Sequence, residues 1–313
     1  MGNPCSAEGD TMVTGDHTTI RTVLARACAT VGLDDTGARV VRCVNNAVYR
    51  LERHPIIVRI TLTPGLRRRA LAAVEAARLL DRHRVPAVQP AQGVTQVVHI
   101  EEHVVTFWLR AVDTGRTPTI SELARLLRRL HRVPAAGAGL PHWDPITDLR
   151  TRIHDARMRG WPVADLDLLA RRCDAVEEAL STVRYELPES VIHGDAQIGN
   201  LIATPGGAIW CDLDTTCVGP REWDLVPVAV RHLRFRPGIN QRSSTDQQRQ
   251  LADAYGFDVT RWPGFPVLRE LRELKLAAVG MPIARDIQTR RELRRRLHSI
   301  RTGDTTTQWT PYR

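Results

Sequence analysis

The sequence lacks the cysteine patterns on which zinc sites and disulfide frameworks are built. Its six cysteines, at positions 5, 28, 43, 173, 211 and 217, include no Cys-x-x-Cys pair and no compact Cys/His cluster. Structural zinc sites need such clustered ligands, so the spacing argues against this class of protein. Isolated cysteines usually behave as small buried hydrophobic residues, and we expect reduced thiols here.

Long apolar runs and a leader-like start are also missing. No run approaches the length of a membrane span, and residues 1–17 mix Gly, Asp, Glu and Thr without an apolar core. We therefore predict a flexible N-terminus over 1–17, no membrane partner and a cytoplasmic location. With 313 residues, 42% of them hydrophobic, the chain is long enough to form a buried core in two domains.

Aromatic residues are scarce, which bears on the strongly positive net charge of +9. They make up 5% of the chain and do not alternate with the basic cluster, so base stacking is not indicated and we predict no nucleic-acid partner. Much of the charge lies in residues 284–301, where seven arginines oppose Asp286 and Glu292. This segment predicts a basic C-terminal helix whose arginines face solvent, or contact a peptide or another anionic partner.

The coarse secondary structure divides the chain into two parts. Helical spacing covers residues 18–29 and 66–82, and extended patterns cover 38–42, 48–51, 56–62, 94–99 and 104–109. These patterns predict a five-stranded antiparallel sheet over residues 18–112. A hinge is expected at 113–115. The remainder, 113–313, is predicted to be mainly helical, with helices at 121–132, 149–160, 164–180, 245–255 and 268–281.

The most specific stretch of the chain runs from Val191 to Asp214. It places Asp195, Asn200 and Asp212 around one hairpin, with a tight turn at 205–207. Carboxylate and amide oxygens in this arrangement suit Mg²⁺ on a nucleotide and the orientation of an attacking hydroxyl. The stretch therefore predicts phosphoryl transfer.

These residues resemble the aminoglycoside phosphotransferase and choline-kinase-like family, which shares the protein-kinase fold. The resemblance covers about residues 20–305 and rests on His193-Gly194-Asp195 with Asn200, Cys211-Asp212-Leu213-Asp214, Glu222-Trp223-Asp224-Leu225 and Leu130-His131-Arg132. It implies an α+β, two-lobed, protein-kinase-like fold. A small five-strand N-lobe (18–112) would bind nucleotide, and a larger, mainly helical C-lobe (113–313) would carry catalysis and the acceptor.

The resemblance also implies a role for each polar residue of the stretch. Asp195 would be the catalytic aspartate that orients or deprotonates the acceptor hydroxyl. Asn200 and Asp212 would be the Mg²⁺ ligands. Asp214 would support these ligands or contact the metal itself, and the sequence leaves both readings open.

Two further residues are implied to support the catalytic loop. His193 invites a general-base interpretation, but its position in the resembling family mostly braces the loop. Asp224 looks like the family's buried carboxylate, which ties the loop together by backbone hydrogen bonds.

The N-lobe departs from the family pattern. Where the family generally has a phosphate-pairing Lys or Arg on the third strand, this chain has Arg59, with Glu75 as the expected ion-pair partner; the alternative is an edge-strand arginine in solvent. No Gly-x-Gly-x-x-Gly lies between the first two strands. Asn45 and Asn46 can replace the glycines there, because asparagine tolerates left-handed backbone and can aim amides at phosphate.

The last predicted strand of the N-lobe corresponds to the segment that contacts adenine in the resembling family. Phe107, Trp108 and Leu109 occupy it, and the resemblance implies contact through their backbone amide and carbonyl groups. Trp108 suits a core position equally well.

The predicted function is an ATP-dependent kinase, with GTP as an alternative donor and Mg²⁺ as cofactor. The acceptor would be a hydroxyl of an antibiotic, sugar or amino alcohol. Aminoglycosides are polycations, and acids at 144, 148, 155, 165 and 167 could line a cleft for one. The basic net charge disfavours such an acceptor.

Two alternatives remain open. One is a kinase of a peptide Ser or Thr, or of another biosynthetic intermediate, with the C-terminal arginines docking an acidic partner. The other is a pseudokinase or nucleotide-binding scaffold, suggested by Arg59 and the missing glycine loop. The intact Asp195, Asn200 and Asp212 argue against the second.

Overall fold

The structure is a computed structural model that describes residues 14–43, 46–62, 67–235, 244–284 and 286–312. Contacts divide the chain into an N-terminal unit, Met1–Val74 with Gln89–Arg110, and a C-terminal unit, Glu75–Val88 with Ala111–Arg313. The division between residues 110 and 111 falls close to the predicted boundary at 112/113. The segment 75–88, which was expected in the N-lobe, groups instead with the C-terminal unit.

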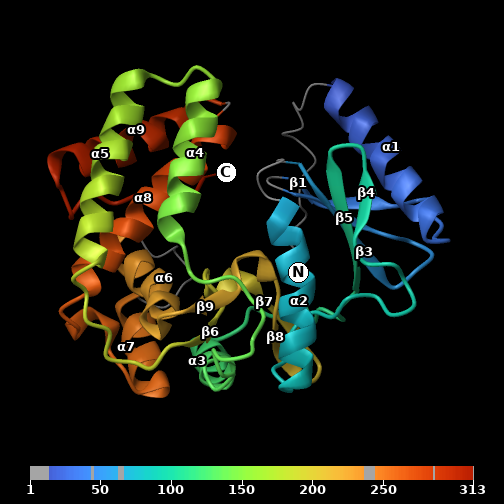
Figure 1. Cartoon of the computed structure of the whole chain (residues 1–313), viewed down its shortest axis with the longest axis horizontal. Helices are drawn as coiled ribbons and strands as arrows, with labels where there is room; N and C mark the ends of the chain where they lie inside the picture. The colour runs from blue at the N-terminus through green and yellow to red at the C-terminus, as the bar shows by residue number, and fades with distance from the viewer. Residues whose placement is uncertain (1–13, 44–45, 63–66, 236–243, 285, 313) are drawn as a thin grey trace. The chain divides into compact units, whose positions relative to one another are not determined.

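The N-terminal unit is built on a five-stranded antiparallel sheet in the order β1-β2-β3-β5-β4 (Figure 1). Its strands are β1 (Arg39–Cys43), β2 (Asn46–Arg50), β3 (Ile56–Thr61), β4 (Val98–Ile100) and β5 (His103–Leu109). β3 carries β-branched residues whose burial alternates over most of its length, as expected for an interior strand. β4 is shorter than the predicted 94–99.

A helix covers this sheet. α1 (Thr14–Thr30) lies against β3 and β4, and its residues Val23, Leu24 and Ala27 are buried in one core with Val58 and Phe107. The helix begins inside the segment predicted to be a flexible N-terminus, and residues 1–13 lie outside the described part of the chain. α2 (Arg67–Arg82) begins in the N-terminal unit and ends in the C-terminal unit.

The C-terminal unit is mainly helical. Its helices are α3 (Ile120–Leu130), α4 (Pro145–Met158), α5 (Val163–Leu180), α6 (Arg221–Arg234), α7 (Ser244–Tyr255), α8 (Phe265–Ile283) and α9 (Ile287–Thr302). Two short antiparallel sheets pair β6 (Ser190–Ile192) with β9 (Cys217–Gly219), and β7 (Leu201–Thr204) with β8 (Gly207–Trp210). α8 packs against α4, α5, α6 and α9. None of the described helices combines the length and apolarity needed to cross a membrane.

The C-terminal helix α9 carries the predicted solvent-facing arginines, at 290, 291, 294, 295 and 301, and Arg296 is the exception among those described. Arg296 is only 1% exposed: its Nε donates to Glu292 Oε1 (3.0 Å) and its Nη2 to the Thr310 carbonyl (2.6 Å). Its guanidinium lies 3.7 Å from the ring centroid of Tyr312. Arg296 therefore fixes the final segment of the chain. Arg285, another member of the predicted cluster, lies outside the described residues.

Candidate active site

The β7–β8 hairpin brings two predicted metal ligands to one end. Leu201 pairs with Trp210 in the hairpin register, and beyond this pair the Cys211 N–H donates to the Asn200 carbonyl (2.9 Å). Asp212 follows immediately in the chain. The backbone of the hairpin, rather than a distant contact, therefore sets the spacing between Asn200 and Asp212.

Asn200 is tied to the predicted catalytic aspartate. Its Nδ2 donates to the Asp195 carbonyl (2.8 Å) and to Asp195 Oδ2 (3.2 Å), and its side chain is buried. Because the amide nitrogen is committed to Asp195, the amide oxygen is the atom with which Asn200 can bind a cation.

Asp212 has an unusual backbone. Its φ of 58° and ψ of 55° are left-handed, a conformation that costs most residues about 1–2 kcal/mol and that aspartate adopts more readily than most. Strain of this kind tends to persist at functional sites. Asp214 lies next to it in a 3₁₀ turn (Leu213–Thr215) and is half-buried.

The donor set of Asn200 and Asp212 fits Mg²⁺ but is small. Amide and carboxylate oxygens are the ligands that Mg²⁺ prefers, and it usually takes only one or two from protein. Within the described residues, no group of three or more His, Cys, Asp or Glu is placed to hold a metal. Phosphate and water oxygens would have to complete the coordination of a cation held here.

Asp224 holds the loop that carries Asp195. Its buried carboxylate accepts from the backbone N–H groups of His193 (2.7 Å) and Gly194 (2.8 Å). The ring Nε2 of His131 lies 3.2 Å from the same carboxylate, and since a carboxylate only accepts, this nitrogen donates. Asp224 thus links α6, the loop and the end of α3.

His193 uses both ring nitrogens within the protein. Nε2 lies 3.0 Å from the Cys211 carbonyl, and Nδ1 accepts from the Asp195 N–H at 3.3 Å. The ring packs against Trp210, with centroids 4.6 Å apart, and the residue is fully buried. These contacts are those of a brace, and they leave no ring nitrogen to take a proton from an acceptor.

Gly194 meets a backbone requirement between these two residues. Its φ is +80°, and a Cβ at this position would lie 2.3 Å from the Thr215 carbonyl oxygen. Any side chain would therefore separate the loop from the turn that follows Asp212.

Arg272 of α8 is a site residue that sequence reasoning missed. Its Nη1 lies 2.7 Å from Asp195 Oδ1, with side chains 8% and 27% exposed respectively. Burial by itself would raise the pKa of the Asp195 carboxyl, but the charges of Arg272 and Lys275 outweigh it and hold that pKa well below its usual range. Asp195 is therefore ionised at neutral pH.

Lys275 lies one turn further along α8. Its Nζ is 5.7 Å from the ring centroid of Trp223, whose Nε1 donates to the Gly194 carbonyl (2.9 Å). The helix was predicted at 268–281, but which of its faces meets the loop was not. One signal was available, because Lys275 is the only lysine in the sequence.

The predicted phosphate ligand Arg59 and its expected ion-pair partner Glu75 belong to separate units. Arg59 is half-buried at the centre of β3, between Val48 and Thr106 in register, so the edge-strand alternative is wrong. Glu75 forms an ion pair with Arg78 (2.7 Å), and its pairing with Arg59 stays a prediction.

The glycine-free loop is only partly described. Asn46 begins β2 and pairs with Thr61, whereas Asn45 lies outside the described residues. Their contact with phosphate stays a prediction.

The predicted adenine-binding strand already uses some of its backbone donors. The Phe107 N–H donates to Gln96 Oε1 (3.1 Å) and the Leu109 N–H to the Gln89 carbonyl (2.8 Å). Trp108 is 3% exposed and donates from Nε1 to Thr106 Oγ1 (2.9 Å), as a core residue would. These two N–H groups already donate within the N-terminal unit. The predicted backbone contact with adenine would therefore have to use other groups of the strand.

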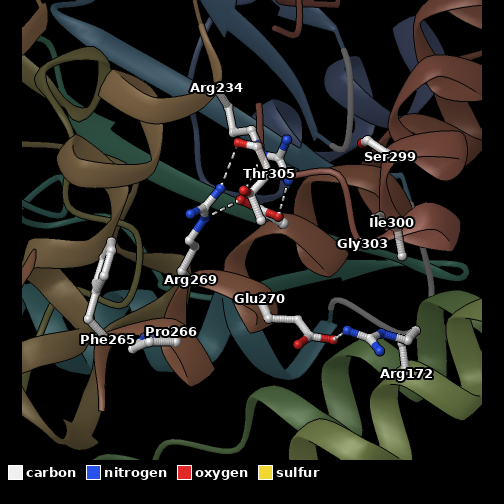
Figure 2. Close-up of a pocket in the computed structure, with 11 residues that line it drawn as sticks. Arg172, Arg234, Phe265, Pro266, Arg269, Glu270, Ser299, Ile300, Gly303 and Thr305 are labelled. Carbon is white, nitrogen blue, oxygen red and sulfur yellow. Dashed lines mark hydrogen bonds and ion pairs between the residues drawn. The ribbon is translucent and has the colours of Figure 1, made fainter. Parts of the chain in front are cut away.

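A hollow of about 240 Å³ lies on another side of α8, lined by Arg172, Arg234, Phe265, Pro266, Arg269, Glu270, Glu273, Ser299, Ile300, Gly303 and Thr305. Figure 2 shows Glu270 pointing toward Arg172, and the two are 2.5 Å apart. Glu273 pairs with Arg234 (2.6 Å) and with Arg269 (2.8 Å). These charges compensate one another and hold the C-terminal segment, so the hollow is part of the scaffold.

One family model matches most of the chain, and several solved structures share its fold. A profile of the family described as "Phosphotransferase enzyme family" matches residues 42–274. The chain is similar to amicoumacin kinase hAmiN in complex with AMP-PNP, Ca²⁺ and Ami (TM-score 0.66, 14% identity, covering 96% of this chain and 98% of that one). It is also similar to the microcompartment-associated aminopropanol kinase (0.64, 18%, 91% and 99%) and to aminoglycoside phosphotransferase APH(3'')-Id from Streptomyces rimosus (0.59, 18%, 83% and 98%).

At identities this low, the structural similarity shows the fold alone, and the predicted α+β kinase-like fold is confirmed. No curated protein matches the sequence significantly.

Proposed function

Because the chain belongs to the phosphotransferase enzyme family, we propose that it transfers the γ-phosphate of ATP to a hydroxyl of a small molecule. The observation that carries the proposal is the linkage of Asp195 to Asn200 at the hairpin end that also bears Asp212. Phosphoryl transfer depends mainly on positioning and charge neutralisation, and this end of the hairpin offers groups for both.

Each group has a distinct task. Asp195 accepts the hydrogen bond of the acceptor hydroxyl and orients its oxygen toward the γ-phosphorus. The Asn200 amide oxygen and the Asp212 carboxylate hold Mg²⁺, which neutralises phosphate charge when bound. Asp224, through the backbone of His193 and Gly194, keeps the Asp195 loop in place.

The acceptor is proposed to be a small molecule that is not a polycation. The acids that could have formed an acidic cleft mostly have local partners, and Arg272 with Lys275 places positive charge beside Asp195. The local contacts are Asp144 with Thr147 N–H (3.0 Å), Asp148 with Arg152 (3.3 Å), Asp165 with Arg301 (2.8 Å) and Asp167 with Arg157 (3.3 Å). A neutral or singly charged acceptor meets less repulsion there.

The first test is nucleotide binding. Mg²⁺-ATP, Mg²⁺-ADP and Mg²⁺-GTP are added to the purified protein, and thermal unfolding is followed. A ligand at 100 times its Kd stabilises the folded state by about 2.7 kcal/mol, so binding is readily seen. Absence of any shift with all three nucleotides would rule the proposal out.

The second test is transfer. Radiolabelled ATP is offered with amicoumacin, aminopropanol, spectinomycin and kanamycin, the molecules named with structurally similar proteins. Asp195→Asn should abolish product. Asp174→Asn is the matched control, because Asp174 also pairs with an arginine (Arg150, 2.8 Å) but is 66% exposed on α5. Binding of nucleotide without transfer to any acceptor or to water would favour the scaffold alternative.

A further inference from the structure

The two oxygens of the Asp195 carboxylate have different surroundings. Oδ2 accepts from Gln197 Nε2 and Asn200 Nδ2, each at 3.2 Å. Oδ1 has almost no accessible surface and no aligned hydrogen bond, and lies 2.7 Å from Arg272 Nη1 in an ion pair. The Asp195 side chain is 27% exposed and Oδ1 is covered, so Oδ1 is not the oxygen that an acceptor would meet.

Arg272 is itself held firmly. It projects from α8, which packs against four other helices of the C-terminal unit, and its side chain is 8% exposed. The adjacent residue Glu273 pairs with Arg234 (2.6 Å) on another side of the helix. The register of α8 is therefore fixed, and with it the position of the guanidinium.

We propose that Arg272 is a positioning residue for phosphoryl transfer, which holds Oδ1 of Asp195 so that Oδ2 faces the acceptor hydroxyl. This inference rests on the proposed function. In the step itself, the acceptor oxygen forms a bond to the γ-phosphorus while the bond from that phosphorus to the β,γ-bridging oxygen breaks. ADP leaves with the electron pair of the broken bond, and the hydroxyl proton passes to Oδ2. Arg272 touches none of the reacting atoms.

A purely structural role would give a different result from positioning. Loss of a buried ion pair lowers stability whether or not the pair aims a catalytic group. Loss of the correct orientation of the Asp195 carboxylate, in contrast, lowers kcat while nucleotide binding stays intact. The reason is that Arg272 contacts Asp195 rather than the proposed metal ligands.

The test compares two arginines of the same helix. Arg272→Met keeps much of the side-chain length but removes the charge. Arg269→Met is the matched control, since Arg269 pairs with Glu273 (2.8 Å) and has no contact with Asp195. With Mg²⁺-ATP and the best acceptor of the panel, or water as acceptor, we expect kcat to fall about 100-fold in Arg272→Met. KM for ATP should not change, and Arg269→Met should retain the parent kcat.

Chemical rescue adds a measurement that a change in stability alone would not affect. In Arg272→Ala, guanidinium chloride at a non-denaturing concentration should restore part of kcat, because the cation can occupy the space beside Oδ1. Should Arg272→Met not fold, Arg272→Gln takes its place under the same criteria.

The outcomes are distinct. Parent-like kcat in Arg272→Met, an equal loss in Arg269→Met, or no rescue of Arg272→Ala by guanidinium would each overturn the positioning role. A parent protein that transfers phosphate to no acceptor and not to water would overturn the proposed function instead.

Discussion

Replacing Gly194 by alanine should separate catalytic geometry from overall stability. At φ +80° an alanine pays a left-handed penalty of about 1–2 kcal/mol. Its Cβ would also lie 2.3 Å from the Thr215 carbonyl oxygen, whereas ordinary contact begins at 3.4 Å. The loop or the turn must therefore move by about 1 Å, and a misplacement of this size can cost about 100-fold in rate.

The matched control is Gly160→Ala. Gly160 has almost the same φ, +76°, but nothing lies within 4 Å of the position of an added Cβ. It follows α4 and has no part in the proposed site. Gly160→Ala should thus show the left-handed penalty alone.

Two measurements decide the outcome. Urea unfolding should show a loss of about 1–2 kcal/mol for Gly160→Ala and a larger loss for Gly194→Ala. Steady-state transfer from Mg²⁺-ATP should be unchanged in Gly160→Ala and about 100-fold slower in Gly194→Ala. If Gly194→Ala unfolds like Gly160→Ala and keeps the parent kcat, the close approach to Thr215 does not constrain Asp195.

Two further predictions concern stability. Asp224→Ala removes the acceptor shared by two buried backbone N–H groups of the loop that carries Asp195. It should lower the unfolding free energy by about 3–5 kcal/mol in urea titrations. An unchanged value would mean that the loop does not depend on this carboxylate. Hydrogen bonds from Arg116 lower the pKa of Glu122 from 4.5 to about 2, so the stability that they add is complete above pH 4.5 and is lost as the pH falls toward 2. Glu122→Gln should flatten this part of the pH dependence of urea unfolding, and the same slope in both proteins would refute the assignment.

The sequence predicted those parts of the site in which residues close together in the chain also lie close together in the fold. Asp195, Asn200 and Asp212 lie around one hairpin, so local pairing brings them together. Strand patterns likewise placed β3, and with it Arg59, because β-branched alternation survives in the fold. Local rules are sufficient where the contacts themselves are local.

Helix α6 was not predicted because its buried side chains include charged ones. Glu222 is fully buried and accepts from the N–H groups of Glu186 and Leu187, each at 2.8 Å. Asp224 accepts from the N–H groups of His193 and Gly194 in the same way. Burial of carboxylates interrupts the apolar periodicity by which amphipathic helices are recognised. The same limitation concealed Arg296, whose burial depends on a segment that follows α9.

Arg272 marks the limit of motif reasoning, because its partner is distant in sequence and its helix is buried on several sides. α8 contacts four helices, so apolar residues occur around much of its circumference and no single polar face is defined. Because the chain is rich in arginine, a single arginine in its sequence does not indicate a functional residue. Lys275 does stand out as the only lysine, and it lies one turn from Arg272 with its ammonium over Trp223, the residue that donates to Gly194. The rare residue type, rather than a known motif, was therefore the signal in the sequence that could have directed attention to this face of α8.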